Sequence, residues 1–363
     1  MLQEKLPSLF EKVIIVAGAR PNFIKVAPLC IELRQRGIPY EVFYSGQHYD
    51  HELYDVFKKD LGLDDGHLAK ITMTGNSIKD IQKIMGAFHS YLKKQSNVTC
   101  VIVVGDVNTT YACSIVTKRF DGIRLAHLES GLRSFDQSMP EEMNRMTVDH
   151  LSDIHLAPSE DAVINLKDEG ITGNVHLVGN IMIDSLIRCL KQIKKDDTKK
   201  SPYCVITFHR QENVDNKEVL EKILDQLISV SKKYKVFFPV HPRTLAKIEE
   251  FGFENKLSQL SVSKPLSYIN FLKIVVNAEF VLTDSGGIQE ETSYLGIPCF
   301  TVRKNTERPV TIRLGTNKLI GYMDIESEVN SMGEKKVRKP IPYWDGNTAK
   351  RIVDLLNKQL FFI

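Results

Sequence analysis

The stretch CVIVVGDVNTT, residues 100–110, decides the fold class of this chain. Its apolar, β-branched run stops at Gly105, and Asp106 stands directly beyond it. A continuous apolar run of this kind is typical of a parallel strand that is buried on both faces. The helix-like segment that follows indicates a strand, a turn and a helix, with Asp106 at the carboxyl end of the strand, where open α/β sheets bind ligands. We therefore expect a doubly wound α/β protein.

The same pattern recurs in two series of apolar strand candidates that alternate with amphipathic segments. The expected strands are 13–17, 40–44, 98–104, 124–127, 154–157 and 175–178 in the first series, and 203–207, 235–239, 260–262, 280–283 and 299–302 in the second. A length of 363 residues also exceeds a usual single core. The sequence predicts two Rossmann-like domains facing across a cleft, over residues 1–179 and 180–346. An amphipathic helix within 347–363 follows and can pack on either domain.

Composition excludes several classes of function. The charged residues make up 26% of the chain and nearly balance at a net charge of +3, so nothing favours a nucleic-acid partner. No apolar run approaches the roughly 18 residues of a membrane span, and the first twelve residues lack the apolar core of a signal peptide. We expect a cytoplasmic protein without a membrane partner.

The six cysteines are scattered without the spacing of a metal site, and reduced structural thiols are the default interpretation. His48 and His51 lack the further ligands that a metal needs. The sequence thus predicts no metal.

Three acidic residues stand just beyond an apolar run or a turn: Asp106, Glu129 and Glu141. Each has a plain structural alternative, because an Asp after a strand often caps a helix and a Glu at a helix start often answers the macrodipole. Together with the nearby His127, Arg133 and Arg145 they favour a site. Carboxylates held near one another and near cations can take different pKa values and act as separate acid and base.

Two glycine turns followed by helices are candidate phosphate sites. In residues 18–25, Arg20 and Lys25 lie near a proline-started helix, although the motif alone is weak. Residues 283–291 repeat the design more clearly. There Ser285, Gly286 and Gly287 let the backbone approach a pyrophosphate, and Glu291, one turn into the helix, is placed to accept ribose hydroxyls. These two turns suggest a nucleotide bound between the domains.

Further candidates are His209 and His241, each just after an expected strand, and Phe271. A solitary histidine is more often structural, but two at strand ends of one domain favour phosphate contact. Phe271 is as well explained by a core position as by stacking on a base.

These segments together resemble the non-hydrolysing UDP-N-acetylglucosamine 2-epimerases, whose two-domain fold is that of GT-B glycosyltransferases. The segments that carry the resemblance are 18–25, 46–48, 105–106, 127–133, 140–145, 209–213, 241–242, 284–291 and 306–309. The resemblance implies inversion at C2 of the sugar without a cofactor. UDP leaves C1 as the C2 proton is removed, and UDP adds back to the resulting 2-acetamidoglucal.

The resemblance also assigns roles. It implies catalytic duties for Asp106, Glu129, Glu141, Arg145 and His209, and leaves open which carboxylate takes the proton. Substrate contacts are implied for Arg20, Lys25, Arg133, His241, Phe271, Ser285, Gly286, Gly287, Glu291 and Arg308. A homodimer is expected by resemblance only.

Departures from the family pattern concern the substrate. The loop 134–139 is short, like that of relatives that act on modified UDP-sugars, and Gln211 and Val310 stand where Arg and Glu are usual. Asp50 replaces a Gln of the run that binds an activating second UDP-sugar in some members, so such activation is not expected. The alternatives are a hydrolysing epimerase that releases N-acetylmannosamine, a GT-B glycosyltransferase and a non-catalytic UDP-sugar sensor. The last would have lost some of the carboxylates, and all three are present.

Overall fold

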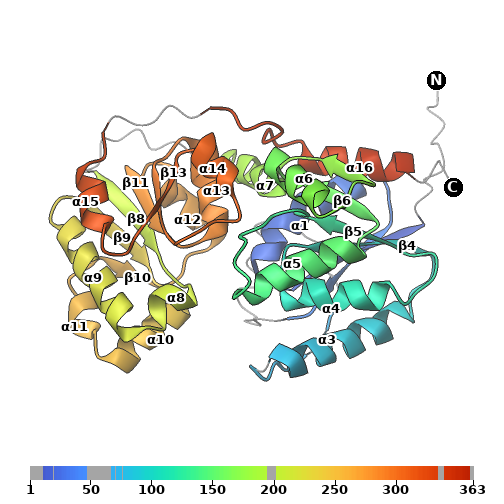
Figure 1. Cartoon of the computed structure of the whole chain (residues 1–363), viewed down its shortest axis with the longest axis horizontal. Helices are drawn as coiled ribbons and strands as arrows, with labels where there is room; N and C mark the ends of the chain where they lie inside the picture. The colour runs from blue at the N-terminus through green and yellow to red at the C-terminus, as the bar shows by residue number, and fades with distance from the viewer. Residues whose placement is uncertain are drawn as a thin grey trace. The chain divides into compact units, whose positions relative to one another are not determined.

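The computed structural model describes residues 11–18, 20–46, 67–69, 71–75, 77–193, 202–333 and 339–359. The chain divides into two compact units, one formed by Met1–Ser185 with Pro342–Ile363 and the other by Leu186–Ile341. Each unit is a parallel sheet with flanking helices (Figure 1), which confirms the predicted Rossmann-like architecture.

The first unit holds, within its described residues, a seven-stranded parallel sheet in the order β3-β2-β1-β4-β5-β6-β7. Its strands are β1 (Lys12–Ala17), β2 (Tyr40–Tyr44), β3 (His67–Leu68), β4 (Val98–Val104), β5 (Arg124–Leu128), β6 (Ile154–Ala157) and β7 (Val175–Leu177). β4 lies between β1 and β5, and its last five residues are buried. Its continuous apolar run therefore predicted its position correctly.

The helices of the first unit are α1 (Arg20–Gln35), α3 (Ser77–Leu92), α4 (Asn108–Thr117), α5 (Pro140–Leu151), α6 (Glu160–Asp168), α7 (Ile181–Leu190, which continues into the second unit) and α16 (Thr348–Gln359). α4 packs between α3 and α5 (Figure 1), and α1 packs against α16. The carboxyl ends of β4 and β5 consequently meet the start of α5.

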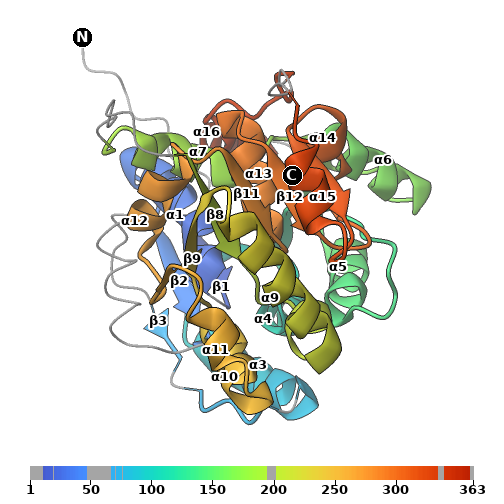
Figure 2. The same ribbon diagram turned by 90° about the vertical axis from the view of Figure 1, so that its left-hand side faces the viewer.

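The second unit holds, within its described residues, a six-stranded parallel sheet in the order β10-β9-β8-β11-β12-β13. Its strands are β8 (Tyr203–Thr207), β9 (Lys235–Pro239), β10 (Val262–Ser263), β11 (Phe280–Thr283), β12 (Cys299–Val302) and β13 (Asn317–Ile320). Its helices are α8 (Gln211–Val214), α9 (Lys217–Ser231), α10 (Pro242–Phe251), α11 (Glu254–Leu257), α12 (Tyr268–Val275), α13 (Gly286–Leu295), α14 (Pro309–Arg313) and α15 (Ile325–Asn330). α9 packs on β9 and buries its apolar stripe against the sheet (Figure 2).

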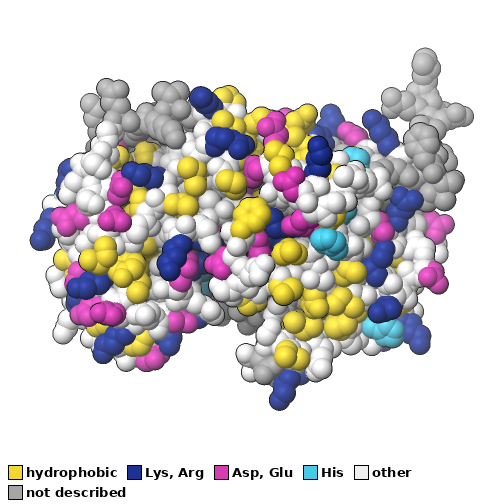
Figure 3. Space-filling view, in the orientation of Figure 1, with side chains coloured by type: hydrophobic (Ala, Val, Ile, Leu, Met, Phe, Trp, Pro, Cys, Tyr) yellow, Lys and Arg dark blue, Asp and Glu magenta, His cyan; other side chains and the backbone are white. Residues whose placement is uncertain are grey.

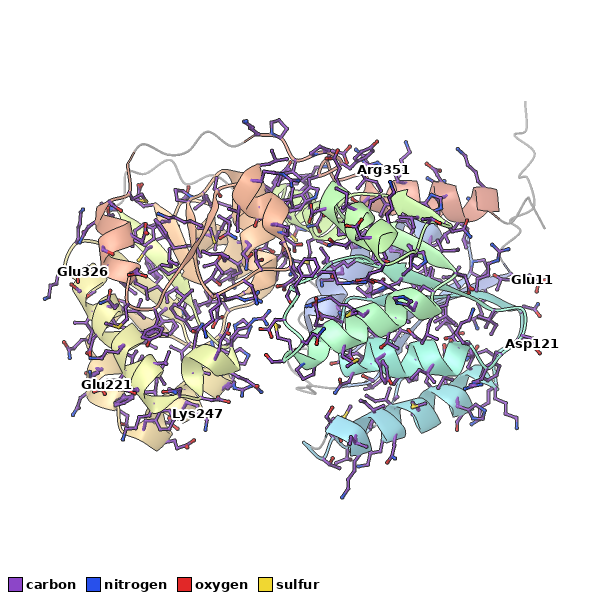
Figure 4. All side chains as sticks on the ribbon, viewed as in Figure 1. Glu11, Asp121, Glu221, Lys247, Glu326 and Arg351 are labelled. Atoms are coloured by element: carbon purple, nitrogen blue, oxygen red, sulfur yellow. The ribbon has the colours of Figure 1, made fainter. Side chains whose placement is uncertain are left out.

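The carboxyl-terminal helix α16 packs on the first unit. The Asp184 carboxylate accepts hydrogen bonds from the backbone N–H groups of Thr348 (3.2 Å) and Ala349 (2.8 Å), and so caps the helix from outside. Arg351, marked in Figure 4, donates to the carbonyl of Val178 at 2.6 Å. Trp344 donates from its indole to the carbonyl of Pro158 at 3.1 Å.

All six cysteines are free and buried. Burial raises the pKa of Cys100 and Cys204 to about 12 each, which keeps both thiols protonated at neutral pH. On the face seen in Figure 3, acidic and basic side chains are interspersed. Within the part of the chain that the structure describes, no helix is long and apolar enough to cross a bilayer.

Candidate active site

Asp106 lies at the carboxyl end of β4 and is held from α5. Arg145, which is only 2% exposed, makes ion pairs with Asp106 and with Glu142. Asn144 donates from its side-chain amide to the carbonyl of Asp106 at 2.8 Å. The Asp106 side chain itself remains 31% exposed. Its backbone is fixed by α5 while its carboxylate stays accessible, as a ligand-binding group requires.

Glu129 follows β5 directly and has an unusual backbone. Its φ of +74° lies in the left-handed region, which costs a residue other than glycine about 1–3 kcal/mol. One carboxylate oxygen, Oε2, lies 2.6 Å from the Lys25 ammonium of α1. The other, Oε1, is buried and accepts no hydrogen bond from the described residues. A buried acceptor left open in this way is suited to a proton or hydroxyl of a bound ligand.

The two glutamates at the start of α5 differ. Glu142 is 1% exposed, accepts hydrogen bonds from the backbone N–H groups of Ser134 (3.0 Å) and Phe135 (2.8 Å), and pairs with Arg145. It therefore fixes the start of the loop 134–139. Glu141, the residue chosen from the sequence, is half-buried. Glu142, three residues before Arg145 on α5, is thus an acidic partner of this arginine.

Arg133 lies in the turn after β5 and is buried. Its side chain is 1% exposed and pairs with Asp149 at 2.7 Å and with Glu169 at 2.6 Å. Burial opposes its charge, but these carboxylates outweigh burial and raise the pKa of the guanidinium. The contacts of Arg133 that the structure shows are thus internal ion pairs, and its role as a substrate ligand stays a prediction.

The second unit has a matching sheet edge around Asp284. This residue is fully buried at the end of β11, and its carboxylate accepts from the backbone N–H groups of His209 (3.1 Å) and Arg210 (2.9 Å) and from the Asn213 amide (3.1 Å). Asp284 therefore holds the turn after β8 against the start of α13. Ser285 is the N-cap residue of α13 and Gly286 its first residue, so the helix presents its amino terminus at this edge.

His209 and His241 lie together here, with ring centroids 5.3 Å apart. The His209 side chain is 39% exposed, with Nδ1 3.2 Å from Asp284. Burial lowers the pKa of His209, and the charges of Arg210 and other arginines lower it further, although Asp284 acts in the opposite direction. The neutral imidazole is favoured. His241 caps α10, and its Nδ1 accepts from the backbone N–H of Arg243 at 3.2 Å.

Arginines and glutamates cluster at the amino terminus of α13. Glu307 lies 2.9 Å from Arg303 and 3.6 Å from Arg210, and also pairs with Arg308. Arg308 lies 2.7 Å from Glu290. A Cβ atom at Gly286 would come within 2.5 Å of the Arg308 guanidinium, so only glycine allows this approach. Three arginines, paired with Glu212, Glu290 and Glu307, therefore lie beside a helix amino terminus, a typical anion site.

Glu291 and Phe271 are the remaining predicted contacts. Glu291 is 3% exposed and accepts a hydrogen bond of 2.7 Å from the Tyr268 hydroxyl. Burial and, to a smaller extent, the charge of Glu290 raise the pKa of Glu291 to about 7 against the opposing Tyr268 hydrogen bond. Phe271 is half-buried and packs against an apolar cluster that includes Val275 and Ile297.

The whole chain is similar to known proteins of one family. A sequence profile of the family described as UDP-N-acetylglucosamine 2-epimerase matches residues 31–357. The chain belongs to this family. It is 37% identical over 372 residues to the UDP-N-acetylglucosamine 2-epimerase of Methanococcus maripaludis, with 95% of this chain and 98% of that protein covered.

Two further epimerases are similar to this chain over nearly its whole length. The UDP-2,3-diacetamido-2,3-dideoxy-D-glucuronate 2-epimerase of Pseudomonas aeruginosa is 31% identical, with 96% of this chain and 99% of that protein covered. The crystal structure of the Methanocaldococcus jannaschii UDP-GlcNAc 2-epimerase in complex with UDP-GlcNAc and UDP superimposes with a TM-score of 0.88 at 36% identity. It covers 96% of this chain and 99% of that one. The family membership and the GT-B-like type of fold that the sequence predicted are confirmed.

For this epimerase family member, the structure adds residues that the sequence did not single out: Glu142, Asp149, Tyr268, Arg303 and Glu307. Glu142, Arg145 and Asp149 are all buried and follow a helical spacing of three and then four. This stripe of charge on the core-facing side of α5 is the signal that could have identified Glu142 and Asp149. The side chain of Arg20 and residues 47–51 lie outside the described residues. Among the described residues, no group of three or more His, Cys, Asp or Glu could hold a metal ion.

Proposed function

We propose that this protein epimerises C2 of a UDP-N-acetylamino sugar without hydrolysing it, by eliminating UDP to a 2-acetamidoglucal and adding UDP back. One observation carries the proposal. Asp106 and Glu129 stand at neighbouring strand ends of a single sheet edge, each beside a cation. Glu129 in addition keeps one buried oxygen open.

The chemistry needs this set of groups. A base removes the C2 proton while the C1–O bond breaks and its electron pair leaves with UDP. A phosphate oxygen of UDP then attacks C1, and an acid protonates C2 on the opposite face. Acid and base on the two faces of one carbon require two carboxylates in different environments. Asp106, Glu129 and Glu141 are the proposed carriers, and the assignment of base and acid among them stays open because close carboxylates titrate together.

The second unit supplies what the leaving group needs. We assign the diphosphate to Ser285, Gly286 and Gly287 at the amino terminus of α13, with His209 and His241 beside it. Backbone N–H groups and the neighbouring arginine side chains stabilise the anion that develops as the C1–O bond breaks. A neutral His209, favoured by its lowered pKa, can still donate one hydrogen bond to that anion.

Nucleoside contacts complete the assignment. Phe271 is proposed to stack on uracil and Glu291 to bind the ribose. The Lys25 side chain, predicted to contact phosphate, lies against Glu129, and we propose that it acts there.

The substrate is a UDP-N-acetylhexosamine, either UDP-N-acetylglucosamine or a modified form of it. The Pseudomonas aeruginosa relative is named for a diacetamido uronate, so the modified class is part of the proposal. A hydrolysing enzyme would follow the same elimination but release the free sugar.

Proton NMR in D2O tests the proposal. The purified protein is incubated with UDP-N-acetylglucosamine, and then with UDP-2,3-diacetamido-2,3-dideoxy-D-glucuronate, without added metal or nicotinamide. Deuterium at C2 with an intact UDP-manno product is expected. Free N-acetylmannosamine would instead identify the hydrolysing type. No exchange with either substrate would overturn the proposed reaction.

A further inference from the structure

Asp149, on the last turns of α5, is a buried carboxylate outside the proposed reaction. It is 1% exposed. Its Oδ1 lies 2.6 Å from Nδ1 of His127 and accepts a hydrogen bond from the Ser130 hydroxyl. Its Oδ2 accepts from the backbone N–H of Gly131 at 3.0 Å and lies 2.7 Å from Arg133. Four donors from the β5 strand and the turn after it therefore converge on one side chain.

The first consequence concerns the turn that presents Glu129. Both Glu129 and Gly131 have positive φ, +74° and +85°. A Cβ atom at position 131 would come within 2.2 Å of the carbonyl oxygen of Ala162, so the turn is tightly confined on that side. The bonds from Ser130 and Gly131 to Asp149 hold this uncommon backbone in place. Together with the Lys25 ion pair, these bonds set the direction of the Glu129 side chain.

The second consequence reaches Asp106. The other ring nitrogen of His127, Nε2, lies 3.0 Å from the carbonyl oxygen of Gly105, the residue before Asp106. A carbonyl oxygen can only accept, so Nε2 carries a hydrogen, and Nδ1 also faces an acceptor in Asp149. His127 is fully buried and links the two strand ends. Asp149 thereby acts on the β4 turn through His127 and on the β5 turn directly.

The same helix carries the third group of the site. α5 carries Glu141 in its first turn, holds Asp106 through Arg145, and ends close to Asp149. We propose that Asp149, with His127, is a positioning pair that sets Asp106, Glu129 and Glu141 in register with one another; this role rests on the proposed epimerisation. Neither residue touches the sugar. Their effect is on the distance between C2 and the carboxylates.

Glu169 provides a matched control. It pairs with the same Arg133 as Asp149 does, at 2.6 Å. Its side chain is 22% exposed, and its pairing involves neither His127 nor the 129–131 backbone. Glu169→Gln therefore weakens the internal ion pair while leaving the contacts to both turns intact. In Asp149→Asn, one carboxylate oxygen is replaced by an amide NH2 group. This group can only donate, so it faces donors that meet an acceptor in the wild-type protein.

The test compares full-length Asp149→Asn and Glu169→Gln with the wild-type protein. Turnover is expressed per site titrated with UDP, and the primary deuterium isotope effect is measured with substrate deuterated at C2. For Asp149→Asn we expect kcat to fall on the order of 100-fold, because a displacement of about 1 Å can cost that much. KM should stay nearly constant and the isotope effect should rise. A loss of folded protein alone would move neither kcat per site nor the isotope effect.

Equal kcat per site and equal isotope effects in the two variants would overturn the positioning role. If Asp149→Asn does not fold, His127→Gln serves instead, since it keeps the Asp149 bonds to Ser130 and Gly131; unchanged kcat and isotope effect there would have the same meaning.

A readout without turnover separates this inference from the proposed function. Hydrogen exchange of peptides that cover 103–110 and 127–133 should accelerate in Asp149→Asn and stay as in wild type in Glu169→Gln, whatever the substrate. Unchanged exchange in both variants would overturn the inference even in an active epimerase. Accelerated exchange in a protein that never deuterates C2 would instead reject the reaction.

Discussion

Asp149 in the first unit and Glu291 in the second are both almost completely buried carboxylates, yet their pKa values move in opposite directions. Burial alone raises the pKa of each. For Asp149, His127, Arg133 and Ser130 outweigh burial and hold the pKa well below its usual range. For Glu291 the neighbours are the neutral Tyr268 and the acidic Glu290, and the pKa rises to about 7. The neighbours, and not the depth of burial, decide the charge of a buried acid.

The two sheet edges differ in the same sense. In the first unit, carboxylates stand at the strand ends and single cations such as Lys25 and Arg145 hold them. In the second, arginines surround a helix amino terminus, with Glu307 between them. The proposed reaction divides along this line, with proton transfer assigned to the first unit and the leaving diphosphate to the second.

The largest expected effect comes from Glu129→Gln. If proton transfer belongs to the first unit, turnover should fall about 1000-fold, since loss of an acid or base typically costs 100- to 10,000-fold. UDP binding, which is assigned to the second unit, should change little. Turnover by NMR and UDP affinity by calorimetry check this, with the exposed Glu160→Gln of α6 as the control. A large loss of UDP affinity with normal turnover would contradict the assignment of proton transfer to the first unit and of UDP binding to the second.

The next effect concerns stability and pH. With its pKa raised from 4.5 to about 7, folded Glu291 keeps a proton that the unfolded chain has released, so its contribution to stability falls as pH rises through that window. The difference corresponds to about 3 kcal/mol. Glu291→Gln should therefore melt close to wild type at pH 5 and several degrees above it at pH 8.

Circular dichroism melts across this pH range give the measurement, with the exposed Glu254→Gln of the same unit as the control. Parallel curves for wild type and Glu291→Gln would mean that the carboxyl group is not the source of the dependence.

The smallest of the three effects is expected for Gly286→Ala. The added methyl group would meet the Arg308 guanidinium at 2.5 Å and displace it from the start of α13. We expect UDP affinity to weaken about tenfold, equivalent to about 1.4 kcal/mol, with proton exchange at C2 preserved at saturating substrate. Gly333→Ala, where an added Cβ meets nothing within 4 Å, is the control. If UDP affinity is unaltered, Arg308 and the amino terminus of α13 do not hold the diphosphate.

Much of the fold could be predicted because buried parallel strands are continuous apolar runs. β2, β4, β6, β8, β9, β11 and β12 have the bounds that the sequence predicted. The edge strand β13 was missed because its run, Asn317–Ile320, contains Lys318 and is apolar only at its end. β3 has two residues and offers no pattern. Edge strands are only partly buried, so periodicity predicts them poorly.

For the site, strand ends could be located from the sequence, but the direction of side chains could not. Asp106 and Glu129 stand at strand ends as expected. Arg133 follows a glycine turn in the same way, yet its side chain turns inward, because Asp149 and Glu169 come from elements distant in sequence. Pairing between buried charges depends on tertiary contacts, which a local pattern does not contain.

The buried thiols have a practical consequence. Since all six cysteines are enclosed and those with raised pKa stay protonated, maleimide reagents have little to attack in the native protein. One new cysteine in place of exposed Ile164 of α6 and another in place of exposed Leu245 of α10 would carry a dye pair without the removal of any native cysteine. Energy transfer between the dyes, recorded with and without UDP, would then follow the separation of the two units in solution during turnover.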